Sequence, residues 1–180
     1  ECYADIFFHA DPTDVGSPFA GQEWFAFVEV EDSVGGIGIA TSLGQEMNTL
    51  RAIDVNQSID YGALEVNTDT GSTNATTSVV NQGNVEINID VQGTDMNNGE
   101  SSVIPSTQQK FATSTFTYSS CGVNCQLVPS TTFVALDVEL TKPTIDTPPV
   151  SDEIFWGIAI PFGISSTPHQ GLNVFTPISP

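Results

Sequence analysis

Strict alternation of apolar and polar residues constrains this chain more than any other feature of its sequence. The run from Asn84 to Val91 alternates without an exception, and the run from Phe133 to Leu140 repeats the pattern. Successive side chains of an extended strand point to opposite faces, so each run predicts a strand with one buried face, as in an antiparallel sheet. The residues on the predicted buried faces are Val85, Ile87, Ile89 and Val91, and then Val134, Leu136, Val138 and Leu140.

Further runs have strand character without such clean alternation. Ile154 to Ile160 is apolar on both faces and therefore predicts a central strand, in which Gly157 leaves room for the close approach of another group. Leu172 to Thr176 predicts a last strand that ends at Pro177. The remaining predicted strands are Tyr3 to His9, Glu23 to Glu31, Ile37 to Thr41 and Phe111 to Tyr118.

Turn residues separate these runs, and no stretch of twelve residues has a helical period. Short strands divided by Gly, Asn and Asp clusters predict an all-β fold, an immunoglobulin-like antiparallel β-sandwich. We place this sandwich at residues 49–180 and an N-terminal strand extension at residues 1–48. Three strands without a full core are marginal alone. The extension must therefore pack on the sandwich, on a neighbouring molecule or on a segment upstream.

Charge excludes several classes of partner. The chain has 22 acidic residues, 3 basic residues and a formal net charge of −19. It has no basic patch that could replace the counterions of nucleic acid or bind anionic lipid. The longest apolar run, Ile154 to Phe162, is too short to cross a bilayer, which needs about 18 residues. The neutral polar surface of Ser, Thr, Asn and Gln, and Glu rather than Met at position 1, favour an exported product or a piece of a longer polypeptide.

Three cysteines bear on the compartment and on metal binding. Cys121 and Cys125 flank Gly-Val-Asn between two strand-like runs, and we predict that they form a local disulfide, as in extracellular proteins. The short loop places the stabilisation at the low end of about 2–4 kcal/mol. A zinc site is the less favoured alternative, because the two histidines are distant in sequence. Cys2 has no evident partner within this sequence.

Part of the chain resembles a known family of domains. Ser58-Ile-Asp-Tyr-Gly-Ala-Leu64 is followed by Asn74-Ala-Thr-Thr-Ser-Val-Val-Asn-Gln-Gly-Asn84, and later by Trp156-Gly-Ile-Ala-Ile-Pro-Phe-Gly163. This pattern, over roughly residues 50–178, resembles immunoglobulin-like repeats of microbial surface and filament proteins. The resemblance implies an extracellular, non-enzymatic module of surface layers, stalks, adhesins or fibres, and it implies nothing about catalysis.

Candidate reactive and modified sites are few. His9 and His169 are the two imidazoles, and neither belongs to a nucleophile motif, so we expect no catalytic residue. A carbohydrate-active enzyme with paired carboxylates is the weakest of the functions considered. Asn56 and Asn74 begin glycosylation sequons. An internal isopeptide bond would need a buried Lys110 or Lys142.

Calcium is the cofactor considered, although the expectation is that none is required. Asp11 and Asp14 lie on one loop, and Asn67 and Asp69 on another, with the oxygen ligands that Ca²⁺ prefers. Neither loop matches a complete calcium-binding motif. Local turns closed by the Asp and Asn side chains are the favoured interpretation.

The N-terminal run supplies the functional hypothesis. Tyr3, Ile6, Phe7 and Phe8 form a short apolar strand that Asp11 to Gly21 separates from the main unit. Such a strand can complete the sheet of a neighbouring subunit, and repeated head-to-tail addition builds a fibre. We therefore expect a secreted or surface-displayed structural protein whose partners are copies of itself. The alternative is an adhesion module that binds a glycan or a protein, with or without Ca²⁺.

Overall fold

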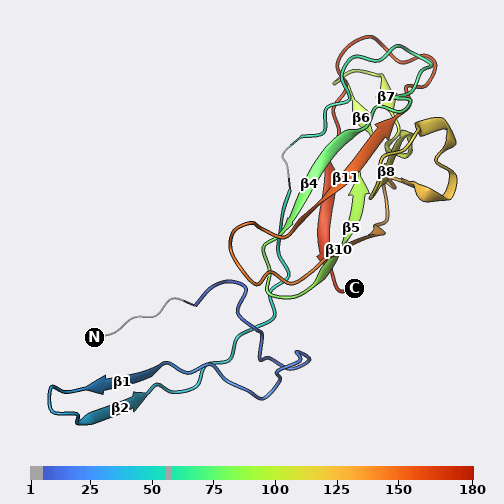
Figure 1. Ribbon diagram of the computed structural model, residues 1–180. Coiled ribbons are helices and arrows are strands. Elements are labelled where there is room, and N and C mark those ends of the chain that lie inside the picture. The colour runs from blue at the N-terminus through green and yellow to red at the C-terminus, as the bar shows by residue number, and fades with distance from the viewer. Residues whose placement is uncertain (1–5, 56–57) are drawn as a thin grey trace.

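Two antiparallel sheets form the body of the protein, which is described by a computed structural model of residues 6–55 and 58–180 (Figure 1). The five-stranded sheet has the order β3-β4-β11-β8-β9 and the three-stranded sheet the order β10-β5-β12. The first consists of β3 (Ile53–Val55), β4 (Ala75–Asn81), β11 (Ser151–Ile158), β8 (Gln109–Ala112) and β9 (Gln126–Leu127). The second consists of β10 (Val134–Leu140), β5 (Ile87–Gly93) and β12 (Asn173–Ile178).

Smaller elements complete the architecture. A two-stranded pair, β6 (Met96–Asn97) and β7 (Val103–Ile104), lies at one end of the body. Three short 3-10 turns cover Ser106–Gln108, Tyr118–Ser120 and Gly122–Asn124. Near the N-terminus, β1 (Phe27–Glu31) and β2 (Ile37–Thr41) pair with each other. The predicted all-β fold is confirmed, whereas the immunoglobulin-like assignment stays a prediction.

The core lies between the two sheets. Trp156 of β11 stacks on Phe111 of β8 at 5.3 Å and meets Phe175 of β12 edge-on at 5.8 Å between ring centroids. This contact links the sheets and adds aromatic pairing to the burial of apolar area. The alternating runs point inward as predicted, with Ile87, Ile89 and Val91 of β5 and Leu136, Val138 and Leu140 of β10 all buried.

The close approach predicted at Gly157 is also confirmed. A Cβ atom added there would lie 2.8 Å from Thr70 Oγ1 and 3.1 Å from the ring of Phe116. The strand itself is central, because β11 pairs with β4 on one side and β8 on the other.

Several predicted strand boundaries were wrong, among them the start of β5, which is Ile87 rather than Asn84, and both ends of β11. β8 ends at Ala112, not Tyr118, because the chain leaves the sheet so that Phe116 N–H can bind Asn74 Oδ1 at 2.9 Å. β12 continues through Pro177 to Ile178, which is possible because β12 is an edge strand and the missing N–H costs no ladder bond.

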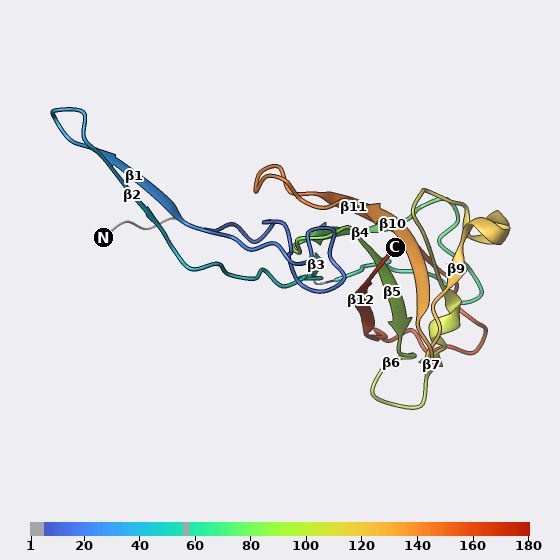
Figure 2. The same cartoon turned by 90° about the horizontal axis from the view of Figure 1, so that it is seen from below.

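The N-terminal region differs from the prediction as well. Tyr3 lies outside the described residues, and residues 6–10 form a turn, closed by the Ala10 N–H bound to the Phe7 carbonyl at 3.0 Å, rather than a strand. The run Glu23 to Glu31 forms a strand only from Phe27. Figures 1 and 2 show that β1 and β2 project away from the body as an isolated hairpin. We call residues 24–45 the arm.

Gly157→Ala tests the close approach in the core. We expect a loss of about 1–3 kcal/mol in the free energy of unfolding, because the added methyl group overpacks the contact with Thr70 and Phe116. Gly38→Ala is the matched control in β2, where the nearest atom to the new Cβ would be a carbonyl oxygen 4.0 Å away. Urea denaturation measures both, and equal stability of the two variants would contradict the packing argument.

Candidate assembly site

The arm is held in a hairpin by its turn. Asp32 Oδ1 accepts the N–H groups of Val34 and Gly36 at 2.9 and 2.8 Å, and Gly35 adopts a φ of 84°. These N–H groups lower the pKa of the Asp32 carboxyl, with the Gly36 bond contributing most. Asp-Ser-Val-Gly-Gly therefore forms the turn that the sequence predicts, and it sets the register of β1 on β2.

Both faces of the arm are uncovered. The register places Phe27, Ile37 and Ile39 on one face, which we call the arm face, and these side chains are 60, 62 and 62% exposed. Val30 on the other face is 61% exposed. A two-stranded ribbon has no interior, and isolated ribbons are at best marginally stable in water. Within the described part of this chain, no second layer covers either face of the ribbon.

Hydrogen bonds hold the root of the arm against the body. Thr13 exchanges two bonds with Met47, and Asp14 accepts the backbone N–H and the hydroxyl of Thr49 at 2.9 and 2.7 Å. Lys142 binds Asp11 at 2.7 Å across to the segment before β11. These contacts fix the point from which the arm projects.

The four calcium candidates do not come together. Asp11 pairs with Lys142, Asp14 binds Thr49, and Asp69 Oδ1 accepts the Gly71 N–H at 2.7 Å in a turn. Asn67 adopts a φ of 62°, and its N–H binds the Ile160 carbonyl. Across residues 6–55 and 58–180, no three His, Cys, Asp or Glu side chains gather as metal ligands. Of the four, Asp69 closes the local turn that the sequence favours, whereas Asp11 and Asp14 bind residues distant in sequence.

Part of the predicted assembly strand is exposed close to the arm. Ile6 and Phe7 are 56 and 55% exposed and Phe8 is 37% exposed. The rings of Phe7 and Phe8 contact the imidazole of His9, which lies 3.2 Å from Asp146. These apolar side chains thus add to the exposed surface, although their backbone is not a strand in this chain.

An apolar groove of about 650 Å³ occupies the end of the body away from the arm. Its walls are two loops, residues 59–66 and 160–169, which lie together at the top of Figure 1. Ile104 and Ile158 are buried at its base, and a second hollow of about 500 Å³ continues it through His169 toward Phe175. The apolar side chains that line the groove include Ile59, Leu64, Met96, Ile160 and Ile164.

Much of the main chain of the groove walls lies outside strand pairing. Residues 59–66 and 161–168 belong to no strand, although side chains bind the Gly62 N–H, the Ser165 N–H and the Thr167 carbonyl. Backbone pairing resumes at Asn67, whose N–H binds the Ile160 carbonyl, and at Gln170, which pairs with Asn97. The groove therefore offers apolar surface together with main-chain groups that no strand pairs, the two things that an added strand uses.

His169 and Tyr61 are the titratable groups with the most defined surroundings at the groove. His169 contacts the Thr167 carbonyl at 2.8 Å and the Ser102 hydroxyl at 2.9 Å, a surface-turn arrangement without a carboxylate. Tyr61 donates its hydroxyl to Gln109 Oε1 at 2.9 Å, and burial raises its pKa. Sequence reasoning did not identify the groove. The available signal was the run of apolar residues in turn-rich segments, such as Ala63-Leu64 and Phe162-Gly-Ile164.

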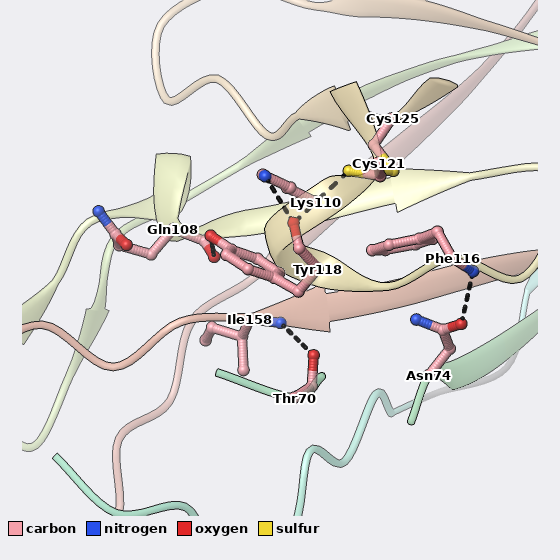
Figure 3. Close-up of a disulfide and its surroundings, with 9 residues drawn as sticks. All are labelled: Thr70, Asn74, Gln108, Lys110, Phe116, Tyr118, Cys121, Cys125 and Ile158. Carbon is pink, nitrogen blue, oxygen red and sulfur yellow. Dashed lines mark hydrogen bonds between the residues drawn. A yellow bond between two sulfur atoms is a disulfide. The ribbon is translucent and has the colours of Figure 1, made fainter. Parts of the chain in front are cut away.

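The predicted disulfide between Cys121 and Cys125 is present, with the two Cα atoms 5.7 Å apart (Figure 3). It closes the connection between β8 and β9. Beside it, Lys110 Nζ lies 4.3 Å from the centre of the Tyr118 ring and donates to the Tyr118 carbonyl at 2.9 Å. Lys110 and Lys142 are thus engaged by Tyr118 and Asp11, respectively.

The two sequons have different outcomes. Asn56 lies outside the described residues. Asn74 accepts the Phe116 N–H, and its Nδ2 atom, the glycan acceptor, is buried (Figure 3). Glycosylation at Asn74 stays a prediction, and in the folded chain it would require the buried Nδ2 atom to become accessible.

No family model matches this sequence, and neither the curated proteins nor the solved structures include one that is similar to it. Within residues 6–55 and 58–180 there is no helix with the length and apolar character of a membrane span.

The carboxyl of Asp14 reports on the root of the arm. Its pKa lies below the ordinary 3.8, first because the Thr49 N–H binds it and second because the Thr49 hydroxyl does. We expect Thr49→Val to raise this pKa partway toward 3.8 and Thr49→Ser to leave it low, as followed by NMR titration. Because the folded pKa is depressed, the contact stabilises the root above about pH 4 and weakens as the pH falls through the folded pKa. An unchanged pKa in Thr49→Val would contradict the hydroxyl contact.

Proposed function

We propose that this protein is a non-enzymatic structural subunit of an extracellular fibre, pilus-like filament or surface layer, joined by β-strand addition between copies of the chain. One observation carries the proposal. The arm presents apolar side chains on both faces and has two open strand edges, which is a liability in a monomer and a binding element in a polymer.

The exposed area of the arm suits a stable contact. Phe25, Phe27, Val30, Ile37 and Ile39 together expose on the order of 500 Å² of apolar surface. A standard interface buries about 800 Å² per partner. The segment Ile6 to Phe8 supplies part of the difference. An arm bound by another molecule would therefore account for most of an interface by itself.

Main-chain pairing is required in addition to apolar burial. At about 25 cal/mol per Å², 500 Å² contributes about 12 kcal/mol. Association costs an estimated 4–15 kcal/mol in lost translational and rotational freedom. Apolar contact alone thus roughly offsets that cost, and the open strand edges of the arm supply the hydrogen bonds that make the contact net favourable.

Location outside the cell fits the same interpretation. The disulfide between Cys121 and Cys125 is favoured in an oxidising compartment. The net charge of −19 keeps free subunits soluble despite the exposed arm. The alternative of a calcium-dependent adhesion module gains no comparable support, because Asp11, Asp14 and Asp69 bind other residues and do not gather with Asn67 at one site.

Phe27→Ser/Ile39→Ser tests the role of the arm. We expect the parent protein to form fibres or larger assemblies in negatively stained micrographs and in light scattering, and the double variant to remain monomeric, because its arm face no longer supplies apolar area. Val15→Ser/Val123→Ser is the control, since these side chains are 96 and 99% exposed but lie outside the arm. Monomers of the parent protein at high concentration would overturn the proposal.

Salt dependence distinguishes this assembly from charge-driven binding. Every contact between copies of a chain with net charge −19 brings like charges together. Raising the salt concentration from about 0.01 to 0.15 M shortens the Debye length from about 30 to 8 Å. We therefore expect the critical concentration for assembly, measured by light scattering, to fall as salt rises. A rise in that concentration would indicate that ion pairs hold the subunits together.

A further inference from the structure

The arm and the apolar groove lie at opposite ends of one chain, and neither is covered within the described residues. We infer that the groove between residues 59–66 and 160–169 is the acceptor for the arm of a second copy of the chain. This inference rests on the proposed function and identifies the partner surface for the same assembly.

Complementary surfaces support this pairing. The arm face offers Phe27, Ile37 and Ile39, and the groove offers apolar walls that include Leu64 and Ile164. The volume of about 650 Å³ lies within the 300–1,000 Å³ of pockets that bury most of a bound group. Neither surface is covered by other residues of its own molecule, and in the contact that we infer the arm face of one copy covers the groove of another.

The main chain is complementary as well. The outer edges of β1 and β2 have no strand beside them in the described sheets, and the two groove loops, residues 59–66 and 161–168, contain main-chain groups that no strand pairs. An arm strand laid along either loop would pair these groups, so that main-chain bonds form together with apolar contact.

The geometry excludes closure within one molecule and favours a fibre. The arm leaves the lower end of the body in Figure 1, whereas the groove opens at the upper end. The strand β1, at about 3.4 Å per residue over Phe27–Glu31, spans about 17 Å and points away from the body. Such a contact joins two different surfaces and leaves a free arm and a free groove at the two ends, so that addition continues.

Pairing of two arms with each other is less favoured. It would leave the groove without an occupant. Like charge does not separate the two arrangements, because Glu29 and Glu31 lie on the arm face and would meet Asp60 and Glu65 in the groove as well. The groove variants below separate the two arrangements.

Leu64→Ser/Ile164→Ser removes apolar side chains from both walls of the groove. We expect the critical concentration for assembly to rise at least about tenfold, because two central interface contacts are lost. Val123→Ser is the control, since Val123 is 99% exposed and lies outside both the groove and the arm. Near-ultraviolet circular dichroism and the melting temperature check the fold. If the double variant is unfolded, Ala63→Trp replaces it. This substitution fills the groove from an exposed position without removing apolar contacts, and it should raise the critical concentration in the same way.

Mixing provides the sharper test. The variant Leu64→Ser/Ile164→Ser keeps an intact arm, and the variant Phe27→Ser/Ile39→Ser keeps an intact groove. A mixture of the two should therefore form dimers of twice the monomer mass, which cannot grow because no further intact arm and groove remain. Assembly of the groove variants at the parental concentration, or a mixture that stays monomeric, would overturn the inference. If the arm variant alone loses assembly, the proposed function stands and the acceptor lies elsewhere. If neither variant loses it, both proposals fail.

Discussion

A β-sheet can bury its apolar side chains only against a second layer, and this requirement governs the whole chain. In the body the two sheets supply that layer to each other, with Trp156 placed between Phe111 of its own sheet and Phe175 of the opposite one. In the arm, β1 and β2 pair only with each other, and the side chains of Phe27, Ile37 and Ile39 stay largely exposed. The molecule thus combines a body whose two sheets cover each other with a two-stranded arm that no second layer covers.

Contacts at the root of the arm determine where the exposed arm projects from the body. Contacts such as Asp14 with Thr49 and Lys142 with Asp11 fix the root, so the arm is presented outward rather than collapsed on the body. At the other end of the body, the groove combines apolar side chains with main-chain groups that no strand pairs, which is the surface that an added strand uses. Apolar attraction between two such surfaces is short-ranged, whereas the net charge of −19 repels copies of the chain at longer range. The assembly that we propose would therefore depend on close fit and on salt concentration.

The sequence predicted those parts of the fold that depend on local pattern. Alternation in Asn84 to Val91 specified the buried face of β5, and Gly157 specified a close approach in β11. The spacing of Cys121 and Cys125 specified their disulfide. The end of β8 could not be predicted, because it depends on Asn74, distant in sequence, capturing the Phe116 N–H. The groove was missed for the same reason, since residues 59–66 and 160–169 become neighbours only when the sheets close.

Amide hydrogen exchange, compared between dilute monomer and assembled material, tests most directly whether the arm is completed by another molecule. The account predicts rapid exchange in residues 24–45 of the monomer and strong protection of the same residues after assembly, with matching protection in the groove loops. Protection of the groove loops without protection of the arm would show that assembly does not bury the arm. Equal exchange of the arm in monomer and assembly would contradict the account.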